Sequence, residues 1–144
     1  REVAARGEAY RWELVSRRER RSNALGPMLP LLEVEGVHFA AGTPLAFERR
    51  LVNLGEVPAI AEADLAGEAP GSWLLAHAPW TEAEHRITAE GADPALARRL
   101  ACPVGSACLA VHRRTWRGDA PVTSVVQHFA PGRQELVARF GARS

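Results

Sequence analysis

The chain has 144 residues, a length that fits one domain able to bury a hydrophobic core of its own. Eighteen basic residues against seventeen acidic ones give a net charge of +1. Because the two signs are interspersed, this balance excludes a broad basic face for nucleic acid or an anionic membrane. No apolar run approaches the roughly 20 residues of a membrane-spanning helix, and the N-terminus lacks the apolar core of a signal peptide. A cytoplasmic protein is therefore expected.

Metal, cofactor and catalytic motifs are missing from the sequence. Cys102 and Cys108 form no CxxC pair and are interpreted as small apolar residues. The histidines show no HExxH or other paired spacing, and there is no Gly-rich phosphate loop or GxSxG motif. No nucleophile has an adjacent base, and the chain contains no lysine for Schiff-base chemistry. We expect no catalytic residue, no metal and no cofactor.

The N-terminal part predicts the end of a helix followed by a strand. Residues 1–7 are interpreted as the last turns of a linker helix that stops at Gly7, and residues 8–144 as the domain itself. Residues 8–16 alternate, with Tyr10, Trp12 and Leu14 on one face of a half-buried strand. The arginines of segment 17–21 are expected at a solvated strand end or loop, with DNA contact as the alternative.

Two segments of one design predict an antiparallel sheet. Residues 31–53 turn at Gly42-Thr43-Pro44, and residues 109–129 turn at Gly118-Asp119-Ala120-Pro121. In each, a glycine permits positive φ and a proline starts the return strand, where a missing N–H donor does least harm. The lead-in to the first hairpin, residues 25–30, looks shorter than that of the second.

Short helices and a last strand complete the prediction. Residues 59–67 are expected to be a turn-rich connector with a helical piece, and residues 71–77 a short helix. Asp93 and Pro94 open a second helix through residue 100 as N-cap and N1 proline. Residues 136–140 are predicted as a strand. These elements indicate an α+β fold with short helices packed on an antiparallel sheet, and a pocket between the layers.

The segment 79–87 concentrates unusual chemistry and is interpreted as the central strand joining the two hairpins. Alternation places His85 on an apolar face and Glu84 on the opposite one, so both reach a single pocket only if a bulge intervenes. A histidine among apolar neighbours is more often a core residue than a functional one.

Other pocket candidates come from helix ends and strand faces. Ser72 and Trp73 lie near a predicted helix N-terminus, where free N–H groups can hold a carboxylate, although Ser72 can equally serve only as a cap. Glu48 can accept from a ligand N–H while Thr123 offers a hydroxyl and Phe129 a stacking surface. The alternative for Glu48 with Arg50 is an exposed ion pair of little energetic consequence.

Several segments together resemble a known family. They are residues 2–7, 45–53, 71–87, 113–116, 121–123, 131–132 and 135–140, with Trp80-Thr-Glu-Ala-Glu-His-Arg-Ile87 the most specific run. In these the chain resembles the effector-binding (UTRA) domain of GntR-type bacterial transcription regulators, in particular the histidine-utilisation repressors (HutC). The resemblance implies a chorismate-lyase-like fold with a pocket for a small metabolite. It also implies a homodimer that contacts DNA only through a winged helix-turn-helix absent from this chain.

The resemblance also implies the effector and its contacts. The expected inducer is urocanate or a related imidazole carboxylate, whose binding releases the operator of histidine-degradation genes. Family positions for ligand contacts match Glu48, Ser72, Trp73, Thr123 and Phe129. The carboxylate is expected at Ser72 and nearby N–H groups. The imidazole would be addressed by Glu48, Glu84 or His85, with Arg50 orienting the carboxylates.

One departure from the family pattern narrows the ligand. Relatives that bind sugar phosphates carry an Arg-x-Arg pair where this chain has Gly36 and His38, so a less charged ligand is expected, with His38 a further candidate contact. Two alternatives stay open: an enzyme acting on chorismate, since the fold is shared, and a dimerisation module with a degenerate pocket.

Overall fold

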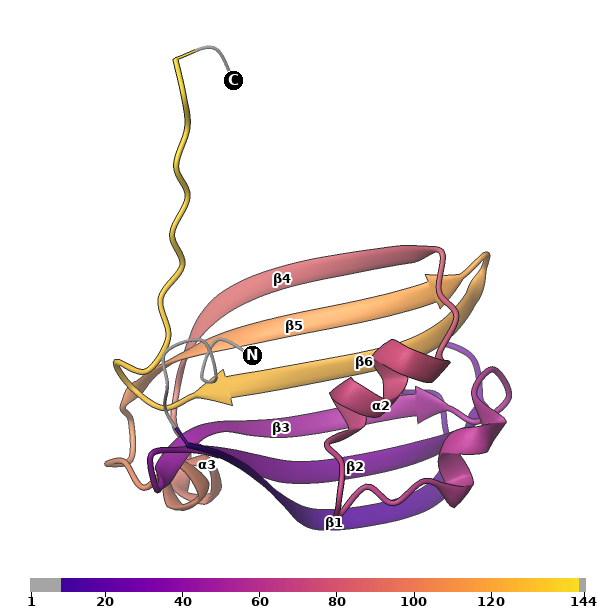
Figure 1. Ribbon diagram of the computed structural model, residues 1–144, viewed down its shortest axis with the longest axis horizontal. Helices are drawn as coiled ribbons and strands as arrows, with labels where there is room; N and C mark the ends of the chain where they lie inside the picture. Colours follow the sequence, from indigo (N-terminus) through magenta and orange to yellow (C-terminus); the bar gives the residue numbers. More distant parts are fainter. Residues whose placement is uncertain (1–8, 143–144) are drawn as a thin grey trace.

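The computed structural model describes residues 9–142, which form one six-stranded antiparallel sheet with three short helical segments (Figure 1). The strand order is β1-β2-β3-β6-β5-β4. In chain order the elements are β1 (Tyr10–Ser22), β2 (Leu29–Ala40), β3 (Thr43–Asn53), the 3₁₀ helix η1 (Pro58–Glu62), α2 (Pro70–His77), β4 (Glu82–Gly91), α3 (Pro94–Leu100), β5 (Ala107–Arg117) and β6 (Ala120–Phe129).

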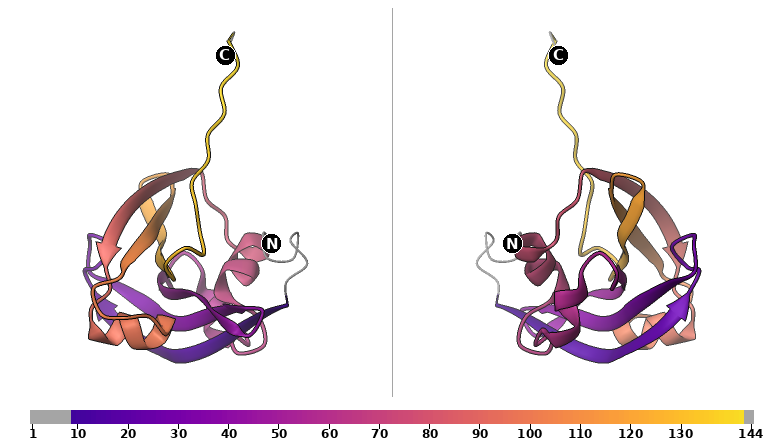
Figure 2. Two further views of the ribbon diagram at one scale, coloured as in Figure 1. Left: turned by 90° about the vertical axis from the view of Figure 1, so that its left-hand side faces the viewer. Right: turned by 90° about the vertical axis from the view of Figure 1, so that its right-hand side faces the viewer.

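The sheet is strongly curved, and the helices lie on its two sides (Figure 2). On the concave face η1 and α2 cover β1, β2 and β3, with Ile60, Trp73 and Leu74 packed against Leu32 and Val34. Trp12 closes the same core from the edge strand and donates from Nε1 to the Leu65 carbonyl at 2.7 Å. Burying this apolar surface is the main driving force that holds the two layers together.

The convex face has a smaller core under α3. Ala97 and Leu100 pack there against Val37, Phe47 and Cys108. The helix begins as the sequence predicts, since the Asp93 carboxylate accepts from the Leu96 N–H at 2.8 Å and Pro94 occupies the first turn. Both cysteines are free thiols and belong to this apolar cluster, in agreement with their interpretation as small apolar residues.

Most of the predicted elements are confirmed. The two hairpins pair as expected, β2 with β3 and β5 with β6, around turns that contain Gly42 and Gly118 with φ of 81° and 60°. The hairpins meet where β3 pairs with β6. The Tyr10, Trp12 and Leu14 alternation is also observed, because Trp12 and Leu14 contact the concave core and Tyr10 contacts His38 on the same face. None of the helices within residues 9–142 is long and apolar enough to cross a membrane.

Two predictions about strands are wrong. The segment around His85 forms β4 at one edge of the sheet, not a central strand, because within residues 9–142 β4 pairs only with β5, and the hairpins join through β3 and β6. Residues 136–140 are extended but belong to no strand. Residue propensity and alternation fit an edge strand, a central strand and an unpaired extended segment equally well. Only pairing between residues far apart in the chain distinguishes these placements. The predicted linker helix at residues 1–7 lies outside the described residues.

The arginine-rich segment 17–21 is part of β1 and has local partners. The Arg17 guanidinium donates to three carbonyls at the end of η1, those of Ile60, Ala61 and Ala63, at 2.6 to 3.0 Å. Arg18 and Arg20 both donate to Glu33 on β2. These contacts agree with the structural interpretation of the cluster, since they hold η1 and the sheet edge in place.

Gly36 is required by the packing of Trp12. It faces the indole across the β1–β2 pair, and a Cβ at this position would overlap the six-membered ring. Gly36→Ala should therefore lower the free energy of unfolding by about 1–3 kcal/mol, measured by urea denaturation. Gly91→Ala is the control, because its Cβ would meet only the Gly105 carbonyl at 3.8 Å. Equal stability of the two variants would contradict this account of Gly36.

Candidate functional site

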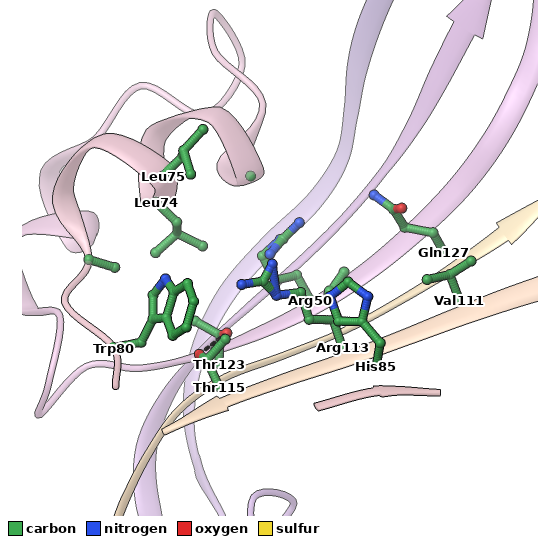
Figure 3. A pocket seen from close by; sticks show the side chains of 13 residues that line it. Arg50, Leu74, Leu75, Trp80, His85, Val111, Arg113, Thr115, Thr123 and Gln127 are labelled. Carbon is green, nitrogen blue, oxygen red and sulfur yellow. Dashed lines mark hydrogen bonds between the residues drawn. The ribbon is translucent and has the colours of Figure 1, made fainter. Parts of the chain in front are cut away.

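A cavity of about 270 Å³ opens between α2 and the concave face of the sheet (Figure 3). Its wall combines apolar side chains from α2 and the strands with cationic and hydroxyl groups that point inward. The lining residues are Arg50, Gly71, Leu74, Leu75, Ala78, Trp80, His85, Val111, Arg113, Thr115, Thr123, Val125 and Gln127. An apolar wall with a few polar groups is typical of small-molecule sites, and the volume is near the lower end of their range of about 300–1,000 Å³.

Beneath the cavity lies a buried carboxylate, Glu48 on β3, with 1% of its side chain exposed. Its Oε1 accepts from His38 Nε2 at 2.7 Å and from Gln127 Nε2 at 2.9 Å, while its Oε2 accepts from Arg50 Nε at 2.7 Å. The alternative of an exposed Glu48–Arg50 ion pair is therefore wrong, because the curvature of the sheet and the cover of α2 remove both side chains from solvent.

The charge on Glu48 is maintained despite its burial. Burial alone would raise the pKa of Glu48, but the Arg50 guanidinium and the His38 imidazole outweigh it and hold this pKa well below its usual range. Glu48 is therefore ionised throughout the neutral range. Because an ionised carboxylate can only accept, it fixes the orientation of all three donors around it.

Arg50 connects this buried charge to the cavity. Its Nε is held by Glu48, and its Nη2 extends to Gly71 in the first turn of α2, where a Cβ would lie only 3.1 Å away. Gly71 thus leaves the space that the guanidinium occupies. One edge of Arg50 is fixed by the protein while the side chain forms part of the cavity wall.

A chain of aromatic contacts extends from Glu48 to the edge strand β1. His38 packs against the Trp12 ring at a centroid distance of 4.9 Å, and its Nδ1 is 2.5 Å from the Tyr10 hydroxyl. Since an ionised carboxylate can only accept, His38 donates to Glu48 through Nε2, and its Nδ1 remains for the contact with the Tyr10 hydroxyl. The position of the buried carboxylate is thereby coupled to residues of β1 and β2.

The opposite wall of the cavity comes from β4, β5 and β6. Thr115 and Thr123 face each other across β5 and β6 with their hydroxyls 2.6 Å apart. The Arg113 guanidinium lies over the Trp80 ring at 5.2 Å, and His85 is its cross-strand partner on β4. Figure 3 shows Arg50, Arg113 and His85 on one side of the cavity and Leu74 and Leu75 of α2 on the other.

The structure brings three of the residues predicted for ligand contact into the cavity wall: Arg50, Thr123 and His85. Glu48 and His38 lie behind Arg50 and Gln127 and are not lining residues. The β4–β5 register continues without a bulge, so Glu84 lies on the face opposite to His85. Phe129, at the end of β6, packs beside Leu45 and Ala46.

Ser72 and Trp73 belong to the predicted helix, but neither is among the residues that line the cavity. The helix begins at Pro70 with Ala69 as its N-cap, and no side chain caps it, so Ser72 is not the cap. The Ser72 and Trp73 N–H groups both donate to the Ala69 carbonyl, at 3.1 and 3.2 Å. Trp73 is buried in the concave core and stacks on His77 with ring centroids 4.1 Å apart.

Sequence reasoning missed four polar or aromatic wall residues: Trp80, Arg113, Thr115 and Gln127. Gln127 shares its strand face with Thr123, so alternation along β6 was a usable signal for it. Arg113 and Thr115 reach the cavity because of the register between β5 and β6. Trp80 is positioned by Thr81, whose N–H donates to the Trp116 carbonyl at 2.7 Å.

A second cavity, of about 320 Å³, lies on the convex face beside α3. Its wall includes Glu90 and His128, and the Glu90 carboxylate is 2.8 Å from His128 Nε2 and 3.2 Å from His112 Nε2. Hydrogen bonds from His128 and from Thr88 lower the pKa of Glu90 to about 2. The charged groups that line this second cavity pair mainly with one another. Residues 9–142 contain no cluster suited to a metal ion.

Comparison with known proteins places this geometry among bacterial regulators. Residues 5–134 match the UTRA domain family. The chain is 33% identical over 147 residues to the histidine utilization repressor of Pseudomonas putida, covering 96% of this chain and 59% of that protein. It is also 33% identical over 151 residues to the histidine utilization repressor of Pseudomonas aeruginosa, with 98% and 59% covered. The chain thus spans about three-fifths of the length of these relatives.

Solved structures show the same fold. The C-terminal domain of the histidine utilization repressor from Pseudomonas syringae pv. tomato has a TM-score of 0.82 at 28% identity, covering 92% of this chain and 99% of that one. The effector domain of PhnF from Mycobacterium smegmatis has a TM-score of 0.83 at 15% identity, covering 97% and 92%. At such low identity, the second similarity concerns the fold alone.

The Glu48 network makes stability depend on pH. The pKa of Glu48 is lower in the folded chain than its ordinary value of 4.5, so its stabilisation is complete above that value and is lost as the pH falls below it. Glu48→Gln should lower the free energy of unfolding by about 3 kcal/mol at neutral pH, because Arg50 then lacks its buried counter-charge. The difference from the unsubstituted protein should narrow below pH 4.5. Chemical denaturation at a series of pH values measures both effects.

Glu84→Gln is the matched control, since Glu84 is an exposed glutamate on the opposite face of the sheet. It should change the free energy of unfolding by less than about 0.5 kcal/mol at neutral pH. A constant difference between Glu48→Gln and the unsubstituted protein across the acidic range would show that the carboxylate charge contributes little.

Proposed function

Because the chain belongs to the UTRA domain family, we propose that it is the effector-sensing domain of a bacterial transcription repressor that controls histidine utilisation. The cavity under α2 is the effector site. The observation that carries this proposal is a concave, largely apolar cavity with two inward-facing guanidinium groups, Arg50 and Arg113. DNA contact belongs to a separate winged helix-turn-helix in the longer regulator, which acts in the cytoplasm as a homodimer.

The proposed effector is urocanate or a related imidazole carboxylate. Such a ligand is small and planar, carries one carboxylate, and has a ring that both donates and accepts hydrogen bonds. Guanidinium groups recognise carboxylates through paired N–H donors. The apolar side chains Leu74, Leu75 and Val111 suit the faces of the ring. The relatives named as histidine utilization repressors support this choice of chemistry.

Each residue of the cavity wall has a proposed role in binding the ligand. Arg113 and Arg50 hold the carboxylate, with the Thr123 hydroxyl as an additional donor. His85 and Gln127 address the imidazole, and Trp80 stacks on it or shields it from solvent. Glu48 and His38 act from behind by orienting Arg50 and Gln127. Ser72, Trp73, Phe129 and Glu84 would contact the ligand only after a rearrangement of α2 or the sheet edge.

The domain is proposed to bind its ligand without transforming it. The lining residues include no serine, cysteine or carboxylate, and the Thr115 and Thr123 hydroxyls are bonded to each other and not to His85, the one histidine of the wall. Ligand binding therefore has to act through the position of α2 and the strands around it. In a repressor, an effector that binds one arrangement of the domain more tightly than another changes the affinity for DNA. By reciprocity, DNA changes the affinity for the effector by the same factor.

Calorimetric titration tests the ligand. Urocanate should bind and raise the melting temperature, while histidine and N-acetylglucosamine 6-phosphate should bind at least about tenfold more weakly. Histidine carries an ammonium group on a tetrahedral carbon, which breaks the plane between its ring and its carboxylate, and the sugar phosphate has neither a carboxylate nor a planar ring. Absence of heat and of a thermal shift with urocanate would refute the choice of effector.

Arg113→Ala should weaken urocanate binding by about 10-fold to 100-fold, the loss expected when one charge-assisted hydrogen-bonding partner is removed. Arg113 is a better test position than Arg50, because replacing Arg113 leaves the buried Glu48–Arg50 pair intact. Arg49→Ala is the matched control, since Arg49 lies on the convex face and pairs with Glu35. Similar affinities for the two variants would place the carboxylate elsewhere.

One specific observation supports the alternative of a chorismate-lyase-like enzyme. Although the Arg-x-Arg positions are occupied by Gly36 and His38, the fold supplies two other arginines to the cavity, enough to hold two carboxylates. Incubation with chorismate separates the hypotheses, because a lyase releases 4-hydroxybenzoate and a sensor does not. A dimer that binds none of these compounds would indicate a dimerisation module with a degenerate pocket.

A further inference from the structure

The polar groups of the cavity wall stand in rows across the sheet. Arg50 on β3 lies opposite Val125 on β6, and Val125 lies opposite Arg113 on β5, so the two guanidinium groups belong to one row. Glu48 and Gln127, which lie opposite each other, belong to the next row on the same face. Successive rows on one face of a sheet are about 6.5 Å apart along the strands. The cavity therefore has a cationic row and, one step away, a row that contains an amide.

The amide of Gln127 has a fixed orientation. Its Nε2 donates to Glu48 Oε1 at 2.9 Å, and Glu48 also accepts from His38 Nε2 and Arg50 Nε, both at 2.7 Å. An ionised carboxylate can only accept, so turning the amide over would set the Gln127 oxygen against a Glu48 oxygen and remove the hydrogen bond. The buried carboxylate therefore holds the NH2 group and directs the amide oxygen, Oε1, away from itself.

The amide oxygen of Gln127 is available to a ligand. Gln127 belongs to the cavity wall, and no hydrogen bond from a donor within residues 9–142 reaches its Oε1. A carbonyl oxygen accepts hydrogen bonds and cannot donate. When a ligand displaces water from such an oxygen without supplying a donor, the oxygen stays unsatisfied and affinity is lost. A ligand that fills the cavity therefore binds best when it brings a donor to this position.

The other polar side chains of the wall do not duplicate this acceptor. Both arginines can only donate. The Thr115 and Thr123 hydroxyls are 2.6 Å apart, so one donates to the other, and His85 lies in the cationic row as the cross-strand partner of Arg113. A hydroxyl or a neutral imidazole can donate or accept to suit a ligand, whereas an amide oxygen cannot. Among the side chains of the lining residues, Gln127 Oε1 is the one obligate acceptor.

We propose that Gln127, oriented by Glu48, determines the effector specificity of the cavity by accepting a hydrogen bond from a ligand N–H. The ligand class is a planar heteroaromatic carboxylate whose carboxylate meets the arginine row and whose ring N–H faces the Gln127 oxygen. A carboxylate of the same shape whose ring has no N–H is rejected. This inference rests on the proposed function of the cavity and adds the group that distinguishes ligands of similar shape.

The discrimination arises mainly from the ligand that lacks the N–H. Its ring expels water from the Gln127 oxygen and gives no hydrogen bond in return, and Glu48 prevents the amide from exchanging the places of its oxygen and its NH2 group. A site built to hydrogen-bond one ligand group rejects a ligand without that group more strongly than an apolar site does. Gln127 thus contacts the ligand, and Glu48 is a positioning residue that acts through it.

Calorimetric titration with urocanate and with its furan analogue, in which a furan ring replaces the imidazole, tests the specificity. The furan ring is a planar five-membered ring like imidazole, but it has a ring oxygen and no N–H. The unsubstituted protein should bind urocanate at least about tenfold more tightly than the furan analogue. In Gln127→Met, which keeps a side chain of similar length without the amide, this ratio should fall to about one.

Gln134→Met is the matched control, because Gln134 is the other glutamine of the chain and lies outside the cavity wall. It should keep the ratio of the unsubstituted protein. Both ligands are measured on the same variant, so a general loss of folded protein affects them alike and leaves the ratio unchanged. Equal affinities of the unsubstituted protein for the two ligands, or an unchanged ratio in Gln127→Met, overturns the proposal while the proposed function stands. Absence of binding by either ligand refutes the choice of effector, and this inference with it.

The orientation of the amide can be measured without a ligand. The side-chain NH2 signals of Gln127 and Gln134 are assigned in isotope-labelled protein by their loss in the two methionine variants. The Gln127 NH2 protons should exchange with water at least about tenfold more slowly than those of Gln134, because a buried carboxylate holds this group. Equal exchange rates would show that Glu48 does not fix the amide and would overturn the proposal, whatever the result with urocanate.

Discussion

The buried carboxylate of Glu48 is the constraint on which the rest of the site depends. An ionised group with 1% of its side chain exposed is stable only where hydrogen-bond donors surround it, and here they come from β2, β3 and β6. The carboxylate accepts from His38 and Arg50 within its own hairpin and from Gln127 of the other hairpin, so these contacts favour the observed register between β3 and β6. The same three contacts set the direction in which Arg50 and Gln127 face the cavity.

This arrangement separates the groups that hold the site from the groups that can meet a ligand. Glu48 and His38 remain behind the wall, while Arg50 and Gln127 each have one side fixed and contribute to the cavity lining. Preorganisation of this kind reduces the conformational entropy lost on binding, because the polar groups are already oriented. On the other wall, Arg113 over Trp80 and the paired hydroxyls of Thr115 and Thr123 are oriented by neighbouring strands. The helix α2 closes the cavity with apolar side chains, so a ligand in the cavity would contact this helix directly.

Sequence reasoning was most reliable where a local pattern has a single physical meaning. The glycine-containing turns, the proline that begins each return strand and the Asp93 cap predicted the two hairpins and α3, because each of these residues satisfies a requirement of the adjacent backbone. Alternation also placed Glu48 and Arg50 on one face of β3. It could not show that this face was buried, because burial depends on α2 and on the curvature of the sheet.

For this protein the sequence by itself determined the fold class, the two hairpins, the faces of the strands and the family. Only the tertiary structure decided that β4 is an edge strand, that residues 136–140 remain outside the sheet, and that Arg113, Trp80 and His85 share a cavity with Arg50. The reason is that strand order and register arise from contacts between residues far apart in the chain. Local propensity and period are the same for a strand at the centre of a sheet, at its edge or unpaired.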